Sequence, residues 1–371
     1  MSKKRPDGEG TLFWDETRKQ WRGRLSADEA GRRPWFSGKT QAEALEKKRS
    51  LERQRGKGVD HTRQVPTVAA FSVTWLETVH RHKRITTASS YEQMVRLYIN
   101  PHVGKIRVDR VTPRIIQGWV DTLSDTLSAY TVRNAYLRLH ALLRLALRDK
   151  LITENPCYEI DLPPLTKENI ASLSLDQVRQ LLAIDHRQHL LLWVYVVLGL
   201  RKGEGLGLKW TDIDGSMVTV QRQVQAILGT VVVSDYTKTG TRTLPIPAAF
   251  VERLRVHRVL QEEERTLMGD AWHEAGFIFP TSVGTPMSPS NAWRMVQRML
   301  KRAGLAAIRV HDLRRTCASL LTHAGVQEVV TAAILGHAAR TMTRQYIDVS
   351  LEQMREALER IYTLCEQPEG L

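Results

Sequence analysis

The sequence lacks the features of a membrane protein or a secreted protein. Its longest unbroken apolar run, Leu190 to Leu200, is far shorter than the roughly 20 residues that a membrane-spanning helix needs. The basic residues at the N-terminus are not followed by an apolar stretch, so we expect no secretory signal. The 3 cysteines, Cys157, Cys317 and Cys365, include no Cys-X-X-Cys pair, which supports neither a zinc ribbon nor a disulfide framework. We therefore expect a cytoplasmic protein with no membrane partner.

Negative charge is also scarce. The 371 residues include 54 Lys and Arg against 40 Asp and Glu, a formal net charge of +14. Nearly all of this excess lies in residues 1–155, whereas residues 156–371 are almost balanced. Hydrophobic residues make up 42% of the chain, which is enough to build ordinary cores. A basic, foldable chain of this length predicts two or three domains and a nucleic-acid partner, and disfavours an ordinary metabolic enzyme.

The first 60 residues predict a small antiparallel sheet followed by a helix. Three short aromatic runs are separated by polar turns, as is typical of strands. These runs are Thr11–Trp14, Trp21–Leu25 and Arg33–Phe36. Thr40 and Glu43 have the spacing of a capping box, which predicts a basic helix that ends near Arg55.

Arg22 and Arg24 alternate along the middle strand, so we expect both side chains on one face of this sheet. Because a sheet can lie in a groove of DNA, these two arginines are candidate DNA contacts. The tryptophans of the same region, Trp14, Trp21 and Trp35, are expected to form the small core instead.

Residues 67–155 have a helical pattern throughout. Phe71, Trp75 and Val79 recur every four residues on one helical face, and two prolines divide the segment into four or five short helices. A polar, glycine-containing stretch precedes the segment, and a proline-rich stretch follows it at 155–166. We interpret both stretches as linkers.

Residues 170–371 predict a mixed, mostly helical domain. Ser174 and Gln177 have the spacing of a capping box for its first helix. Runs of β-branched residues predict strands that form one small sheet. These strands are expected at Met217–Val224, Ala226–Val233 and Thr243–Ile246. Leu351, Met354, Leu358 and Ile361 then recur at helical spacing and predict an amphipathic C-terminal helix.

The predicted fold class is therefore α+β and mainly α. It combines an N-terminal three-stranded β-sheet plus helix in residues 1–60, an all-α domain in 67–155, and a mixed, mostly helical domain with a small antiparallel sheet in 170–371.

Five motifs follow one another between residues 199 and 346. They are Gly199-Leu200-Arg201-Lys202-Gly203-Glu204, Thr237-Lys238-Thr239-Gly240, His311-Asp312-Leu313-Arg314-Arg315-Thr316, Leu335-Gly336-His337 and Thr343-Arg344-Gln345-Tyr346. Their order and spacing resemble the tyrosine recombinases, the phage integrase family. In the lambda-integrase-like, three-domain type of this family, the three segments correspond to an arm-type DNA-binding domain, a SAM-like core-binding domain and a catalytic domain with a tail helix.

The chemistry of this family requires a nucleophile. Breaking a DNA strand without losing the energy of its phosphodiester bond needs a covalent intermediate. A tyrosine that attacks phosphorus forms a phosphotyrosine, which a free 5′-hydroxyl of DNA can reverse. The resemblance assigns this role to Tyr346, through a 3′-phosphotyrosine link.

The reaction also requires positive charge around the phosphate. Guanidinium groups stay protonated and bind two oxygens at once, so they can neutralise the transition state without a metal ion. The resemblance places Arg201 and Arg314 in these positions. Glu204, three residues after Arg201, could orient that arginine, although a simple i,i+3 salt bridge is the alternative.

The remaining catalytic positions concern proton transfer. The resemblance makes Lys238 the general acid that protonates the departing 5′-oxygen, with an ordinary exposed turn lysine as the alternative. His311 would accept or relay the tyrosine proton or bind a phosphate oxygen, and His337 would bind another oxygen. Arg315 is not expected to be catalytic.

The resemblance implies a site-specific recombinase that integrates a phage or mobile element, with excision as the reverse reaction. Four copies would act on double-stranded DNA at core-type and arm-type attachment sites and pass through a Holliday junction. A host DNA-bending protein and a directionality factor would be partners, and the protein would associate with the nucleoid when active. No metal or other cofactor is expected.

Two alternatives remain open at this stage. A type IB-like topoisomerase uses similar chemistry, and a DNA-binding regulator could carry a non-catalytic recombinase domain. The tail helix is expected to dock on a neighbouring protomer, with packing on its own domain as the alternative.

Overall fold

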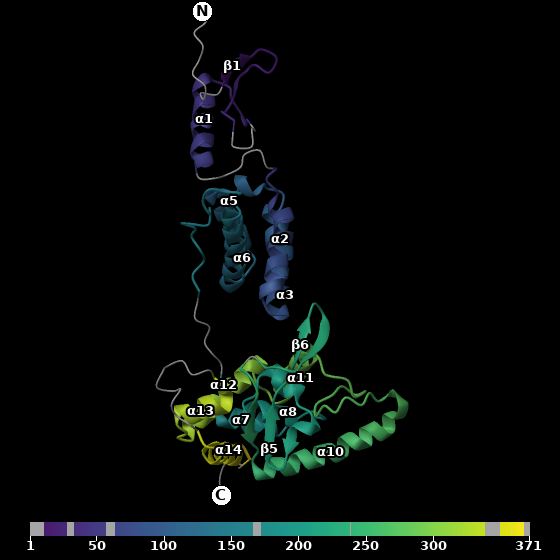
Figure 1. The fold of residues 1–371 in the computed structure, drawn as a ribbon. Helices are drawn as coiled ribbons and strands as arrows, with labels where there is room; N and C mark the ends of the chain where they lie inside the picture. Colours follow the sequence, from purple (N-terminus) through teal and green to yellow (C-terminus); the bar gives the residue numbers. More distant parts are fainter. Residues whose placement is uncertain are drawn as a thin grey trace, which may run out of the picture. The chain divides into compact units, whose positions relative to one another are not determined.

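The computed structural model describes residues 11–27, 33–56, 64–165, 172–237, 239–337 and 349–366. The chain divides into two compact units, Met1–Lys167 and Glu168–Leu371 (Figure 1). The predicted fold class is confirmed, because helices predominate and the sheets are small and antiparallel. No helix of the described ranges is long and apolar enough to cross a bilayer.

The first unit begins with the predicted sheet and helix. The elements are β1 (Thr11–Asp15), β2 (Gln20–Arg24), β3 (Trp35–Gly38) and α1 (Gln41–Gly56), with the strands in the order β1-β2-β3. Thr40 starts α1 by accepting a hydrogen bond from the Glu43 backbone N–H at 3.2 Å. A small core of Leu25, Phe36 and Ala44 joins the sheet to α1.

The prediction that three tryptophans form this core is wrong for two of them. Trp14 is 39% exposed and Trp35 is 44% exposed, and only Trp21 packs against the core. Neighbouring residues of a strand point to opposite faces, so Trp35 faces away from the helix because Phe36 faces towards it. The Phe36 ring in turn covers Gly23, where a Cβ atom would lie only 2.3 Å from the ring.

The rest of the first unit is a helical bundle. Its elements are α2 (Val68–His82), α3 (Ile85–Met94), the π-helical turn η1 (Val95–Ile99), α4 (Asn100–Val103), the 3₁₀ turn η2 (Val108–Arg110), α5 (Pro113–Ser124) and α6 (Ala129–Arg148). Phe71, Trp75 and Val79 are buried on one face of α2, as the spacing predicts. Thr112 caps α5 directly before a proline at its first position, a combination that fixes where the helix begins.

The second unit is built around a fully buried helix. Its helices are α7 (Leu175–Leu182), α8 (Leu190–Val196), α9 (Lys202–Gly207), η3 (Trp210–Asp212), α10 (Ala248–Met268), η4 (Gly269–Ala271), α11 (Pro289–Arg302), α12 (Val310–His323), α13 (Glu328–Leu335) and α14 (Leu351–Glu366). Every residue of α8 is buried, which explains its unbroken apolar sequence. The Ser174–Gln177 capping box of α7 is confirmed.

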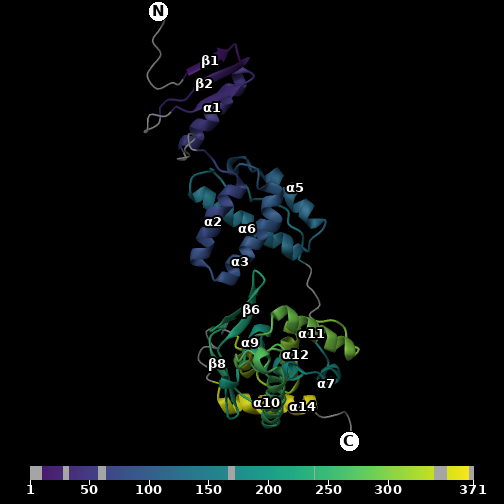
Figure 2. The same cartoon turned by 90° about the vertical axis from the view of Figure 1, so that its right-hand side faces the viewer.

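The single small sheet predicted for this unit is wrong, because the strands form two separate sheets. These strands are β4 (Ile213–Asp214), β5 (Met217–Val220), β6 (Gln223–Ile227), β7 (Thr230–Ser234) and β8 (Arg242–Pro245). One sheet has the order β4-β5-β8, and β6 and β7 form a hairpin of their own (Figure 2).

A buried carboxylate explains where the predicted strand breaks. Asp212 accepts hydrogen bonds from the side chains of Gln221, at 2.8 Å, and Arg222. Gln221 and Arg222 are therefore not part of a strand, and they separate β5 from β6. The hairpin turn follows at Leu228 and Gly229, whose φ angles of 50° and 86° suit a tight turn between antiparallel strands.

The C-terminal helix packs on its own unit, which is the alternative to the expected docking on a neighbouring protomer. Met354, Leu358 and Ile361 of α14 are buried in the same core as α8, whereas Leu351 is 50% exposed. Tyr362 accepts a hydrogen bond from Arg253 Nε at 2.7 Å. The apolar face of α14 is thus buried against its own unit.

Candidate active site

The C-terminal end of α13 organises the candidate site. Gly336 follows the helix with a left-handed φ of 61°, a conformation that glycine adopts without strain. Arg314 Nη2 donates a hydrogen bond to the carbonyl of Leu335, and Arg201 Nη2 donates one to the carbonyl of Gly336 at 3.3 Å. The partial negative charge of a helix C-terminus favours such cations. His337 comes directly after these carbonyls, so the structure brings Arg201, Arg314 and His337 together.

Arg314 is held rigidly. It lies on α12, is only 3% exposed, and also donates from Nη1 to the carbonyl of Gly199 at 2.7 Å. Burial, together with the positive charge of Arg201, lowers the pKa of Arg314 to about 10. The guanidinium is therefore still charged at neutral pH, and its position is set by two backbone segments far apart in the sequence.

Arg201 is held by a buried carboxylate. It precedes α9 as the capping residue, and its backbone N–H donates to Glu204 Oε2 at 3.0 Å. Its Nη1 donates to Glu204 Oε1 at 2.7 Å and to Thr239 Oγ1 at 3.0 Å. The predicted neighbours Arg201 and Glu204 are thus in contact, and Glu204 is fully buried rather than part of a surface salt bridge.

A third arginine shares this carboxylate. Arg242 of β8 donates from Nη2 to Glu204 Oε2 at 2.8 Å. Burial acts to raise the pKa of Glu204, but the hydrogen bonds and charges of Arg242 and Arg201 outweigh it and lower the pKa to about 2. Sequence reasoning did not place Arg242 in the site. Its only signal was a position four residues after Lys238, at the start of the next strand.

His311 occupies the first turn of α12, one helical turn before Arg314. Partial burial of its ring and the positive charges of Arg315, Arg314 and Arg201 lower its pKa, although Asp312 acts in the opposite direction. A lowered pKa leaves the imidazole neutral near pH 7, so it can accept a proton. Arg315 donates to Asp312 at 3.1 Å and is held within its own helix.

Two predicted site residues, Lys238 and Tyr346, lie outside the residues that the structure describes. Thr237, which precedes Lys238 in the sequence, donates a hydrogen bond from its hydroxyl to the carbonyl of Gly240. Thr239, the next residue after Lys238, contacts Arg201 through the hydrogen bond given above. Thr239 therefore adjoins the arginine cluster.

The structure places Arg22 and Arg24 on the outer face of the N-terminal sheet. Their guanidinium carbons lie 4.5 and 4.1 Å from the centre of the Trp35 ring. Arg22 also pairs with Asp15 at 2.9 Å. Phe13, which is 43% exposed, packs edge-on against the same tryptophan. The expected common face is present, with an exposed aromatic surface beneath the two charges.

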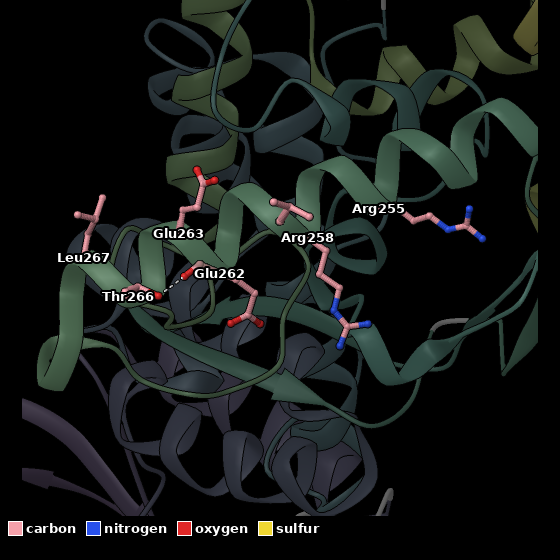
Figure 3. A pocket seen from close by; sticks show the side chains of 7 residues that line it. Arg255, Arg258, Glu262, Glu263, Thr266 and Leu267 are labelled. Carbon is pink, nitrogen blue, oxygen red and sulfur yellow. Dashed lines mark hydrogen bonds between the residues drawn. The ribbon is translucent and has the colours of Figure 1, made fainter.

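A large hollow of the second unit lies elsewhere. It has a volume of about 720 Å³ and runs along the outer side of α10, between residues such as Arg255, Glu262 and Leu267 (Figure 3). None of the residues of the five motifs lines it. Among the described residues there is also no cluster of three or more metal-ligating side chains. The arginine cluster is therefore not part of this hollow.

Comparison with known proteins places these features in a family. Residues 171–353 match the phage integrase family, and residues 67–124 match the phage integrase N-terminal SAM-like domain. A tyrosine recombinase XerC-like protein of Caldanaerobacter subterraneus subsp. tengcongensis is 28% identical, over 92% of this chain and 94% of that protein.

Solved structures show the same fold. The Tn1549 transposon integrase, in complex with transposon right end DNA, superposes with a TM-score of 0.63 at 22% identity, covering 80% of this chain and 99% of that one. A lambda integrase from a tetramer bound to a Holliday junction has a TM-score of 0.60 at 17% identity, covering 93% and 97%.

The chain belongs to the phage integrase family of tyrosine recombinases. Its activity is site-specific DNA recombination, and it is an enzyme. Neither a topoisomerase nor a non-catalytic regulator is favoured by the comparisons.

Replacing Gly336 by alanine should impair cleavage. A Cβ atom there would lie 3.0 Å from Arg242 Cδ, in a left-handed turn that costs any other residue about 1–2 kcal/mol. Because Gly336 supports Arg201, we expect single-turnover DNA cleavage to fall by about 10²-fold, the usual effect of a small misplacement.

Gly325→Ala is the matched control, since Gly325 has a φ of 73° and, among the described residues other than its chain neighbours, no atom lies within 4 Å of the position that an added Cβ would take. It should lose similar stability in urea unfolding and still cleave DNA. Equal cleavage by the two variants would contradict the role given to Gly336.

Proposed function

We propose that Arg201 and Arg314 bind the non-bridging oxygens of the scissile phosphate. The observation that carries this proposal is the anchoring of both guanidiniums on the successive carbonyls of Leu335 and Gly336. Because both guanidiniums are already anchored, neither needs to reorganise when negative charge develops on the phosphate. His337, next along the chain, supplies a further hydrogen bond to the same group.

The covalent step uses three further residues, Tyr346, His311 and Lys238, beside the clamp that Arg201 and Arg314 form on the phosphate. The Tyr346 oxygen attacks phosphorus, the bond from phosphorus to the 5′-oxygen breaks, and a 3′-phosphotyrosine forms. His311, neutral near pH 7, takes the tyrosine proton, and Lys238 gives a proton to the departing 5′-oxygen. Attack by a 5′-hydroxyl of the partner DNA reverses these transfers and rejoins the strand. The arginines stabilise the transition state in place of a metal ion.

The charge of the first unit supports a division of labour on DNA. We assign arm-type site binding to residues 1–60, core-type binding to residues 67–155 and strand transfer to residues 170–371. Four copies would exchange strands through a Holliday junction, the kind of DNA to which the lambda integrase tetramer is bound. A host DNA-bending protein and a directionality factor would complete the complex on the bacterial nucleoid.

The phosphate clamp is tested by Arg201→Lys, which keeps the charge but loses the two-pronged donor. Removing one such preorganised interaction costs about 10²–10³-fold in rate, so single-turnover cleavage of a nicked substrate should fall by that factor. Binding of the same DNA, measured by gel shift, should change little.

Arg315→Lys is the control, because Arg315 is the neighbour of Arg314 but pairs with Asp312. It should cleave at nearly the wild-type rate. If Arg201→Lys cleaves as fast as the wild type, the clamp is not formed by Arg201.

The outer face of the N-terminal sheet is tested by the salt dependence of DNA binding. Each phosphate contact that is lost should reduce the slope of log affinity against log salt by about 0.9. We therefore expect Arg22→Gln/Arg24→Gln to flatten the slope relative to the wild type. Lys47→Gln/Lys48→Gln removes the same charge from α1, behind the sheet, and should leave the slope unchanged. Equal slopes for both double variants would rule out this face as the DNA contact.

A further inference from the structure

Arg242 is a buried cation that none of the five motifs includes. Its side chain is only 12% exposed, and an ion pair joins its Nη2 to Glu204. Its Nε and Nη1 atoms are buried without a hydrogen-bond partner in the described part of the chain. A charged group in this state destabilises a fold, since its donors have lost water without replacement. Stability alone therefore does not account for an arginine at this position.

Arg242 contacts both of the groups that hold Arg201 in place, which we call its two supports. The first support is Glu204, whose Oε2 accepts from Arg242 while its Oε1 accepts from Arg201 Nη1. The second support is the backbone at Gly336. A Cβ atom built on Gly336 would lie 3.0 to 3.2 Å from Cδ, Nε and Cζ of Arg242, so the guanidinium rests against the turn whose carbonyl binds Arg201.

We infer that Arg242 is a positioning residue for strand cleavage: it binds Oε2 of Glu204 and packs against the Gly336 turn, so that Arg201 stays aimed at the phosphate. This inference rests on the proposed function of Arg201. Arg242 itself touches no reacting atom in this arrangement. Its buried guanidinium instead holds the Glu204 oxygen that the Arg201 side chain leaves free.

The role of Arg242 can be measured through its effect on the pKa of Glu204. Burial pushes the pKa of this carboxyl up, and Arg242 is the foremost group that pulls it down, followed by Arg201. Among the described residues, Arg314 from α12 also interacts electrostatically with this carboxylate. Without Arg242 the effect of burial prevails and the pKa of Glu204 rises. A protonated Glu204 no longer binds Arg201 as an anion, so cleavage should then be lost as the pH falls.

The test compares full-length wild type with Arg242→Met, which keeps an apolar stem of similar length, and with Arg242→Lys, which keeps the charge. Single-turnover cleavage and DNA binding are measured between pH 5 and pH 8.5 on DNA that carries the core site. Wild-type cleavage should show no loss due to Glu204 in this range. Arg242→Met should bind DNA normally. At pH 7 it should cleave about 10–10²-fold more slowly than the wild type, as expected for a misplaced catalytic group. Towards pH 5 it should lose a larger fraction of its activity than the wild type does. Arg242→Lys should restore the shape of the pH profile.

A second substitution separates positioning from general damage. In Arg242→Met/Glu204→Gln no carboxyl remains to titrate, so the additional loss at low pH should disappear. A purely structural role would give a slow variant whose pH profile has the same shape as that of the wild type, with no recovery by lysine, and that result would overturn the inference. Full activity of Arg242→Met would overturn it as well.

A readout without DNA distinguishes this inference from the proposed function. The Glu204 carboxyl can be followed by ¹³C NMR in protein labelled at glutamate, with Glu204→Gln identifying the signal. Its pKa should rise in Arg242→Met and return towards the wild-type value in Arg242→Lys. An unchanged pKa would contradict the inference even if Arg201→Lys proves the clamp. A raised pKa with a fully active Arg201→Lys variant would instead contradict the proposed role of Arg201.

Discussion

The site depends on the carbonyl end of α13. Leu335 and Gly336 present successive carbonyls, and each accepts a hydrogen bond from one guanidinium, so two positive charges are held side by side despite their repulsion. The left-handed turn at Gly336 makes this arrangement possible, because it ends the helix and leads directly into His337. Arg201 comes from the segment after α8 and Arg314 from α12. The short helix α13 therefore joins two parts of the sequence that are more than 100 residues apart, at the place where the phosphate is expected.

One carboxylate offsets this concentration of positive charge. Glu204 is fully buried and binds both Arg201 and Arg242, which keeps it ionised far below neutral pH. Such a group is costly to bury alone, and it is tolerated here because two cations share it. Partial burial and the neighbouring guanidiniums keep His311 neutral at physiological pH. The electrostatics of the cluster thus favour bound anions and a histidine that accepts protons, both of which a metal-independent phosphoryl transfer requires.

Much of this architecture could be predicted from local sequence. The apolar spacing of Phe71, Trp75 and Val79, the capping box at Ser174, and the i,i+3 relation of His311 and Arg314 are all short-range signals, and the structure contains them. The wrong predictions concerned features that depend on how the elements pack against one another. The break between β5 and β6 depends on Asp212, which binds Arg222 from another segment. Trp35 is exposed because Phe36 takes the inner face. Arg242 resembled any strand arginine until the fold placed it on Glu204, and no spacing in the sequence reveals that contact.

The covalent link between protein and DNA provides the most direct test of the proposed chemistry. The protein would be mixed, in EDTA, with end-labelled DNA that contains its binding site, and the products separated under denaturing conditions beside those of Tyr346→Phe. We expect a protease-sensitive, slowly migrating adduct with the wild type and none with Tyr346→Phe, although both proteins bind the DNA. An adduct that persists in Tyr346→Phe, or no adduct from wild-type protein that clearly binds its site, would contradict cleavage through a phosphotyrosine at this position.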